Sequence, residues 1–77
     1  MKYYYTFGTS AQFPYKKGWV EVIAEDRDEV DKKFRTYFPD KNPGLLNCSS
    51  IYTEDNFNKT EMKKLGNLGV FCHEVIE

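Results

Sequence analysis

Apolar and polar positions alternate with a period of two in the first part of the chain. The segment KYYYTF (2–7) places three aromatic rings on one side of an extended backbone and Tyr4 on the other. The segment GWVEVIA (18–24) alternates in the same way, and both segments are rich in aromatic or β-branched residues. These patterns predict two β-strands, and the Gly, Ser, Pro and Lys residues between them predict a long connection.

The period changes to three or four residues after the second strand. Apolar side chains then recur at Val30, Phe34 and either Tyr37 or Phe38. This spacing predicts an amphipathic helix that Asp26 caps, with the Glu29 side chain reaching back to the cap residue. Pro39 ends the helix because it cannot continue the hydrogen-bond ladder.

The rest of the chain predicts the second half of the same domain. The segment DKNPGLLNCSS (40–50) is rich in turn residues, and Ile51-Tyr52 predicts a short strand. Thr53 is a candidate N-cap for a more polar helix that continues to about Lys64, and glycines end it before a last strand. The order β-β-α-(β)-α-β predicts one small α+β domain over residues 1–77, with a mostly antiparallel sheet and two helices.

Composition argues against several classes of protein. The net charge of -1 argues against a dedicated DNA-binding protein, which carries a basic excess, so we expect no direct contact with nucleic acid. No apolar run approaches the roughly 18 residues of a membrane span, and the N-terminal segment lacks the apolar stretch of a signal peptide. We therefore expect a cytoplasmic protein, a monomer or weak dimer, whose cysteines are thiols or metal ligands rather than a disulfide.

The sharpest candidates for site chemistry are Cys48, Cys72 and His73, because thiolate sulfur and imidazole nitrogen are preferred zinc ligands. Neighbouring residues point to opposite faces of a regular strand, so Cys72 and His73 reach one ion together only if the backbone kinks. Water or a carboxylate would complete the shell, and the candidate carboxylates are Asp40, Glu54, Asp55 and Glu74. The alternative is a buried thiol and a histidine at the edge of the core.

A catalytic pair of Cys48 with His73 would need a third group to orient the imidazole, and no nucleophile signature is present, so we do not expect an enzyme.

Two further sets of residues are candidates for partner binding. The densest charge feature is an acidic run, whose candidate contact residues are Glu25, Asp28, Glu29 and Asp31. These carboxylates can mimic nucleic-acid phosphates or dock a basic protein, and the alternative is an ordinary acidic helix start with a solvated face. Among the aromatic residues, we expect Tyr4, Tyr15 and Trp19 to be exposed, where they can stack on a nucleobase or anchor a protein interface.

Taken together, the segments YYYTFG, FPY, GWVEVIAE, LNCSSIYTED and CHEVIE resemble small proteins that phages and prophages of Firmicutes encode, streptococci included. Some proteins of this group look like anti-CRISPR proteins that inhibit type II-A RNA-guided nucleases, and a zinc-containing member fits the pattern. The resemblance implies an anti-defence protein that binds a host CRISPR nuclease in the host cytoplasm. It also implies a structural zinc, with Cys48, Cys72 and His73 as the matching positions.

The leading hypothesis is therefore a non-enzymatic inhibitor. It would present its acidic run to a nuclease surface that normally receives nucleic acid, with Tyr15 and Trp19 as apolar anchors. One alternative is a sponge that captures a nucleotide signal by stacking on Tyr and Trp rings, near the basic pair Lys16-Lys17. A phage structural or packaging accessory protein is a third class.

Overall fold

The elements of the fold follow the predicted order, with one helix split in two. The structure, a computed structural model, describes all 77 residues. Its elements are β1 (Lys2–Thr6), β2 (Trp19–Ile23), α1 (Arg27–Tyr37), β3 (Ser50–Thr53), α2 (Glu54–Asn58), the 3₁₀ helix η1 (Glu61–Leu65) and β4 (Cys72–Ile76). The prediction of a small α+β domain with two helices is confirmed. None of the helices combines the length and apolar character needed to cross a membrane.

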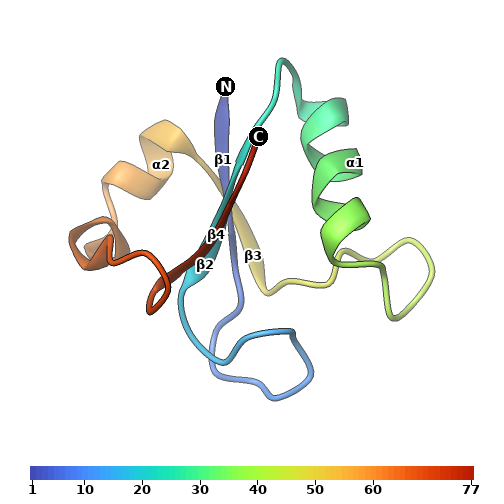
Figure 1. Cartoon of the computed structure of the whole chain (residues 1–77), viewed down its shortest axis with the longest axis horizontal. Coiled ribbons are helices and arrows are strands. Elements are labelled where there is room, and N and C mark those ends of the chain that lie inside the picture. Colours follow the sequence, from blue (N-terminus) through green and yellow to red (C-terminus); the bar gives the residue numbers. More distant parts are fainter.

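The four strands, which overlap one another between α1 and α2 in Figure 1, form one mixed sheet in the order β3-β1-β2-β4. β1 is antiparallel to both β2 and β3, whereas β4 is parallel to β2. The expected mostly antiparallel sheet is thus found for two of the three strand pairs, and the edge strand β4 is the exception. β4 differs because the chain leaves β3 at one edge of the sheet and crosses to the other edge before β4 begins. β4 then runs in the same direction as β3 and β2.

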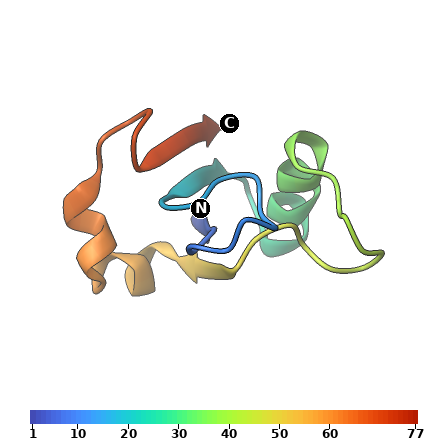
Figure 2. The ribbon, with the colours of Figure 1, turned by 90° about the horizontal axis from the view of Figure 1, so that it is seen from below.

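α1 lies on one face of the sheet, and α2 with η1 lies on the other (Figure 2). α1 belongs to the connection from β2 to β3, whereas α2 and η1 belong to the connection from β3 back across the sheet to β4. Connections between parallel strands are almost always right-handed. Two such connections that run in opposite directions therefore place their helices on opposite faces, and the central strands are covered on both sides.

This double coverage explains the run of three tyrosines in β1. Tyr5 faces α1, and its ring stacks on Phe34 with 4.1 Å between centroids. Tyr4 faces α2, and its ring stacks on Phe57 with 4.0 Å between centroids. The α1 face holds a core cluster of nine buried residues, and the α2 face holds a smaller cluster of three, which includes Tyr4 and Trp19.

The predicted cap at the start of α1 is half confirmed. The Asp26 side chain accepts a hydrogen bond from the Glu29 backbone N–H at 2.8 Å. The expected return bond is absent, because the Glu29 carboxylate lies 3.8 Å from the Lys33 ammonium and turns along the helix instead. Phe38 caps the helix at its other end, directly before Pro39, as predicted.

The second predicted helix is correct at its start and wrong in its length. Thr53 caps α2 by accepting a hydrogen bond from the Asn56 backbone N–H, but α2 ends after five residues and η1 follows. The two apolar anchors explain the break, since Phe57 and Met62 both pack against the smaller core cluster. Five residues of continuous α-helix would place these side chains about 140° apart around the axis. A break between them lets both reach the sheet.

Candidate functional site

The sheet separates the two cysteines. Cys48 lies before β3 and packs against the larger core cluster, whereas Cys72 opens β4 and packs against the smaller cluster on the other face. Burial raises the pKa of Cys48 to about 11, and the Asp31 carboxylate adds to this effect. Burial, followed by the Glu21 carboxylate, also raises the pKa of Cys72. Both free thiols therefore stay protonated at neutral pH, which makes them poor nucleophiles.

His73 is held by the loop 8–17 rather than by a thiol. Its ring stacks on Tyr15, with 4.0 Å between centroids and 2° between the ring planes. Its Nε2 contacts the backbone carbonyl of Lys17. The register between β2 and β4 shifts by one residue after Cys72, which leaves His73 as the extra residue of a β-bulge. The kink that zinc binding would need at this position exists, but it directs the imidazole to Tyr15.

The structure does not bring the three predicted zinc ligands together. Zinc requires sulfur and nitrogen ligands at about 2.0–2.3 Å, and Cys48 and Cys72 lie on opposite faces of the sheet. Among the candidate carboxylates, Asp40 pairs with Arg35 at 3.1 Å. No three His, Cys, Asp or Glu side chains form a group that could hold a metal ion. These residues do not fit a zinc site in this arrangement, although the sequence resemblance implies one, and the response of the protein to a chelator decides between the two.

Part of the acidic run is free on the surface at the start of α1. Glu25, Asp26 and Asp28 are exposed, and Glu25 and Asp28 take part in no ion pair. Glu29 is partly exposed, with Lys33 as a distant partner at 3.8 Å. We call Glu25, Asp26, Asp28 and Glu29 the acidic surface.

Asp31, the fourth predicted contact residue, is bonded inside the protein. Its carboxylate accepts a hydrogen bond from the buried Tyr5 hydroxyl at 2.6 Å and pairs with Arg27 one turn earlier on α1. The Arg27 guanidinium also lies over the Tyr3 ring, 5.4 Å from its centroid. Asp31 therefore fastens α1 to β1 and is not part of the acidic surface.

Two of the three aromatic residues expected at the surface are buried. Trp19 and Tyr4 each expose 3% of their surface, because α2 and η1 cover the face that a two-layer domain would leave open. Tyr15 is partly buried, and His73 covers one face of its ring. The exposed aromatic residue is Tyr37, at 55%, in the last turn of α1. The helical spacing allowed either Tyr37 or Phe38 at the core, and the structure selects Phe38.

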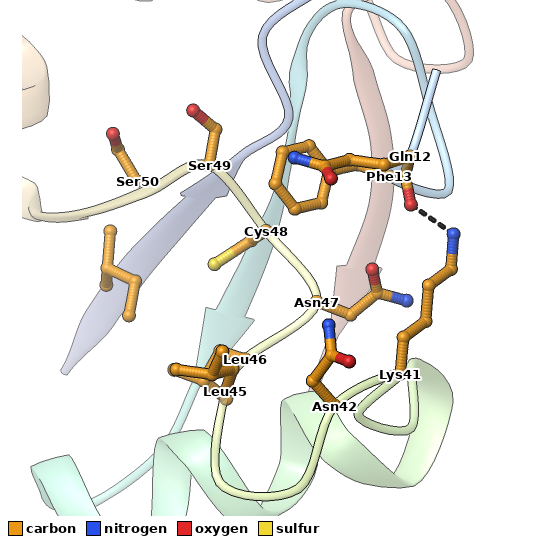
Figure 3. Close-up of a pocket in the computed structure, with 11 residues that line it drawn as sticks. Gln12, Phe13, Lys41, Asn42, Leu45, Leu46, Asn47, Cys48, Ser49 and Ser50 are labelled. Atoms are coloured by element: carbon orange, nitrogen blue, oxygen red, sulfur yellow. Dashed lines mark hydrogen bonds between the residues drawn. The ribbon is translucent and has the colours of Figure 1, made fainter. Parts of the chain in front are cut away.

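A groove of about 490 Å³ lies between the loop 8–17 and the segment 41–51 (Figure 3). The Lys41 ammonium donates a hydrogen bond to the backbone carbonyl of Gln12 and ties the two segments together. Apolar side chains line the groove beside the amides of Asn42 and Asn47. Sequence patterns did not identify this groove, because its walls are irregular loops that meet only in the folded chain.

The chemistry of this groove suits binding better than catalysis. Cys48 is the only thiol in its lining, and no histidine or carboxylate lies there to take a proton from the thiol. Lys41 is the only charged side chain in the lining, and its hydrogen bond to Gln12 occupies it. What remains is a set of amide and hydroxyl groups, which can hydrogen-bond a neutral polar ligand.

Comparisons with known proteins add no family to this description. No protein-family model matches the chain, and neither a search of the curated proteins nor a search of the solved structures finds a match. The fold and the acidic surface are therefore interpreted from the residues themselves.

Proposed function

We propose that this protein is a phage anti-defence protein that binds a type II-A RNA-guided nuclease in the host cytoplasm and blocks its engagement or cleavage of DNA. The proposal has it act by binding, without catalysing a reaction. Its support is the resemblance of the sequence segments to phage-encoded inhibitors, together with the acidic surface. The observation that carries it is the exposure of Glu25, Asp26 and Asp28, which lie just before and within the first turn of α1.

The acidic surface has the charge needed to compete with nucleic acid. RNA-guided nucleases hold their nucleic acids in a positively charged channel and recognise them through the backbone. Carboxylates on a folded surface can occupy part of such a channel in place of phosphates. Electrostatic complementarity of this kind mainly raises the association rate, so inhibition should weaken as salt is added.

The fold keeps these carboxylates in fixed positions. Val30 and Phe34 are fully buried and fix α1 on the sheet, while the bond from Tyr5 to Asp31 holds its first turns. Asp26 is also held, since its side chain caps the helix. A preorganised surface loses less conformational entropy on binding than a mobile acidic tail would.

Charge-neutralising variants test the role of the acidic surface. The variant Glu25→Gln/Asp28→Asn/Glu29→Gln removes three negative charges from it. The matched control Glu54→Gln/Asp55→Asn/Glu61→Gln removes three from exposed positions on α2 and η1. We expect the first variant to bind a streptococcal type II-A nuclease at least about tenfold more weakly in a surface-capture assay, and the control to bind like the unmodified protein. Equal losses in the two variants would contradict the assignment of the surface.

A further inference from the structure

A second cleft, of about 410 Å³, opens on the α2 face at one end of the sheet. β1 ends at this cleft with Thr6, and β2 begins there with Trp19. Phe71, directly before β4, contributes a further aromatic ring, and η1 contributes Met62 and Leu65. We call this site the η1 cleft. It is a different cavity from the groove of Figure 3, which is lined mainly by the segment 41–51, and the two share only Ser49 and Ser50.

The segment 65–70, which begins at one residue of the η1 cleft and ends just before another, holds an unusual concentration of exposed apolar side chains. Leu65 is 44% exposed, Leu68 is 68% exposed and Val70 is 54% exposed. These three belong to the seven large apolar residues that the whole protein exposes, and all three fall in a segment of six residues. Scattered apolar residues are ordinary on a protein surface, whereas a contiguous group beside a cleft is typical of a binding site.

The charge around the η1 cleft is positive. Lys17 is the only charged residue in its lining, and no carboxylate lines it. Lys17 is exposed and takes part in no ion pair, and the same holds for Lys16 beside it and for Lys63 on η1. An apolar cleft with the unpaired Lys17 ammonium in its lining complements a ligand that combines an apolar group with negative charge.

We propose that the η1 cleft binds a short acidic peptide segment of a partner protein. In this complex a large apolar side chain of the peptide enters between Trp19, Met62 and Phe71, and a neighbouring carboxylate pairs with the Lys17 ammonium. The hydroxyl groups of Thr9, Ser49 and Ser50, which also line the cleft, can hydrogen-bond the peptide backbone. The site does not depend on the proposed inhibition of a nuclease, because it lies on the opposite face from α1.

Trp19 makes this proposal measurable, because it is the only tryptophan of the chain and it lines the cleft. A displayed library of random twelve-residue peptides is selected against the full chain, and an enriched peptide is then titrated while Trp19 fluorescence is recorded. We expect enriched peptides to combine a large apolar residue with Asp or Glu, and to shift the Trp19 emission on binding.

Variants then locate the site. Lys17→Glu should weaken binding of the enriched peptide about tenfold, since it replaces an attractive charge by a repulsive one, and Leu65→Ser should also weaken it. Lys32→Glu makes the same charge change at an exposed position on α1 and should alter the affinity less than about twofold. Circular dichroism of each variant confirms that it is folded.

Several results would overturn the proposal. Selection that enriches no peptide, or only neutral and basic ones, would contradict the proposed occupant. Equal weakening by Lys17→Glu and Lys32→Glu would show that general charge, and not the cleft, attracts the peptide. A Trp19 shift caused by anionic lipid vesicles or by self-association, with none caused by peptide, would assign the cleft to a membrane surface or to a second copy of the chain.

Discussion

Replacing Gly18 by alanine should be among the most damaging single changes in this protein. Gly18 has φ +83, a backbone conformation that costs an L-residue about 1–2 kcal/mol. A Cβ atom at this position would also lie 2.0 Å from the backbone carbonyl oxygen of Phe71 and 2.9 Å from Nε2 of His73. The start of β4 would have to move away, and the 2.8 Å hydrogen bond from the Trp19 backbone N–H to Phe71 would be lost.

These three effects at Gly18 add to a large share of the total stability. Backbone strain of about 1–2 kcal/mol, overpacking of about 1–3 kcal/mol and a lost hydrogen bond of about 1 kcal/mol give a loss of about 3–6 kcal/mol. A chain of 77 residues has a free energy of unfolding of about 4–12 kcal/mol. We therefore expect Gly18→Ala to lose a large part of its free energy of unfolding at room temperature.

Gly44 provides the matched control for this prediction. It has φ +81, almost the same as Gly18, but nothing lies within 4 Å of the position that a Cβ would take. Gly44→Ala should therefore lose only the backbone strain of about 1–2 kcal/mol. Urea denaturation followed by circular dichroism measures both variants. The reasoning is refuted if Gly18→Ala loses no more stability than Gly44→Ala, because the contact with the start of β4 would then have no energetic effect.

Three further predictions concern the thiols and the buried hydroxyl of β1. The losses of unfolding free energy in Cys48→Ser and Cys72→Ser should add in the double variant to within about 0.5 kcal/mol, and a chelator should leave the melting temperature of the unmodified protein unchanged. If the two cysteines instead shared a zinc ion, each single variant would lose as much stability as the double variant. Tyr5→Phe should lower the free energy of unfolding by about 1–3 kcal/mol in urea denaturation, because it leaves the carboxylate of Asp31 without its hydroxyl donor, and an unchanged value would contradict that role. Burial raises the pKa of Cys48 from 9.0 to about 11, so this thiol ionises less readily in the folded state than in the unfolded state. Its contribution to the free energy of unfolding should therefore be fully present below pH 9 and should be lost as the pH rises from 9 to 11. This loss should vanish in Cys48→Ala.

Local patterns along the chain predicted the positions of the elements well. Period-two alternation identified β1 and β2, and the spacing of Val30 and Phe34 identified α1. Asp26 and Thr53 cap their helices as predicted. These features depend on hydrogen bonds and side chains within a few residues of each other, so the local sequence is sufficient to predict them.

The errors arise where distant segments meet. Tyr4 and Trp19 were expected at the surface, whereas α2 and η1 cover the face of the sheet on which they lie. The zinc ligands stay a prediction from residue type, and the folded chain packs Cys48 and Cys72 against core clusters on opposite faces of the sheet. Asp31 belongs to an acidic run, and only the folded chain brings it to the Tyr5 hydroxyl. Residue types alone do not determine such pairings.

Inhibition of DNA cleavage by a streptococcal type II-A RNA-guided nuclease tests the proposed function most directly. The purified protein is titrated into a reaction that contains the nuclease, its guide RNA and a matching DNA substrate, at low salt where electrostatic association is strong. The proposal predicts that cleavage stops as the protein approaches the concentration of the nuclease, and that it returns when the carboxylates of the acidic surface are neutralised. Full cleavage at a large molar excess of the unmodified protein would contradict it.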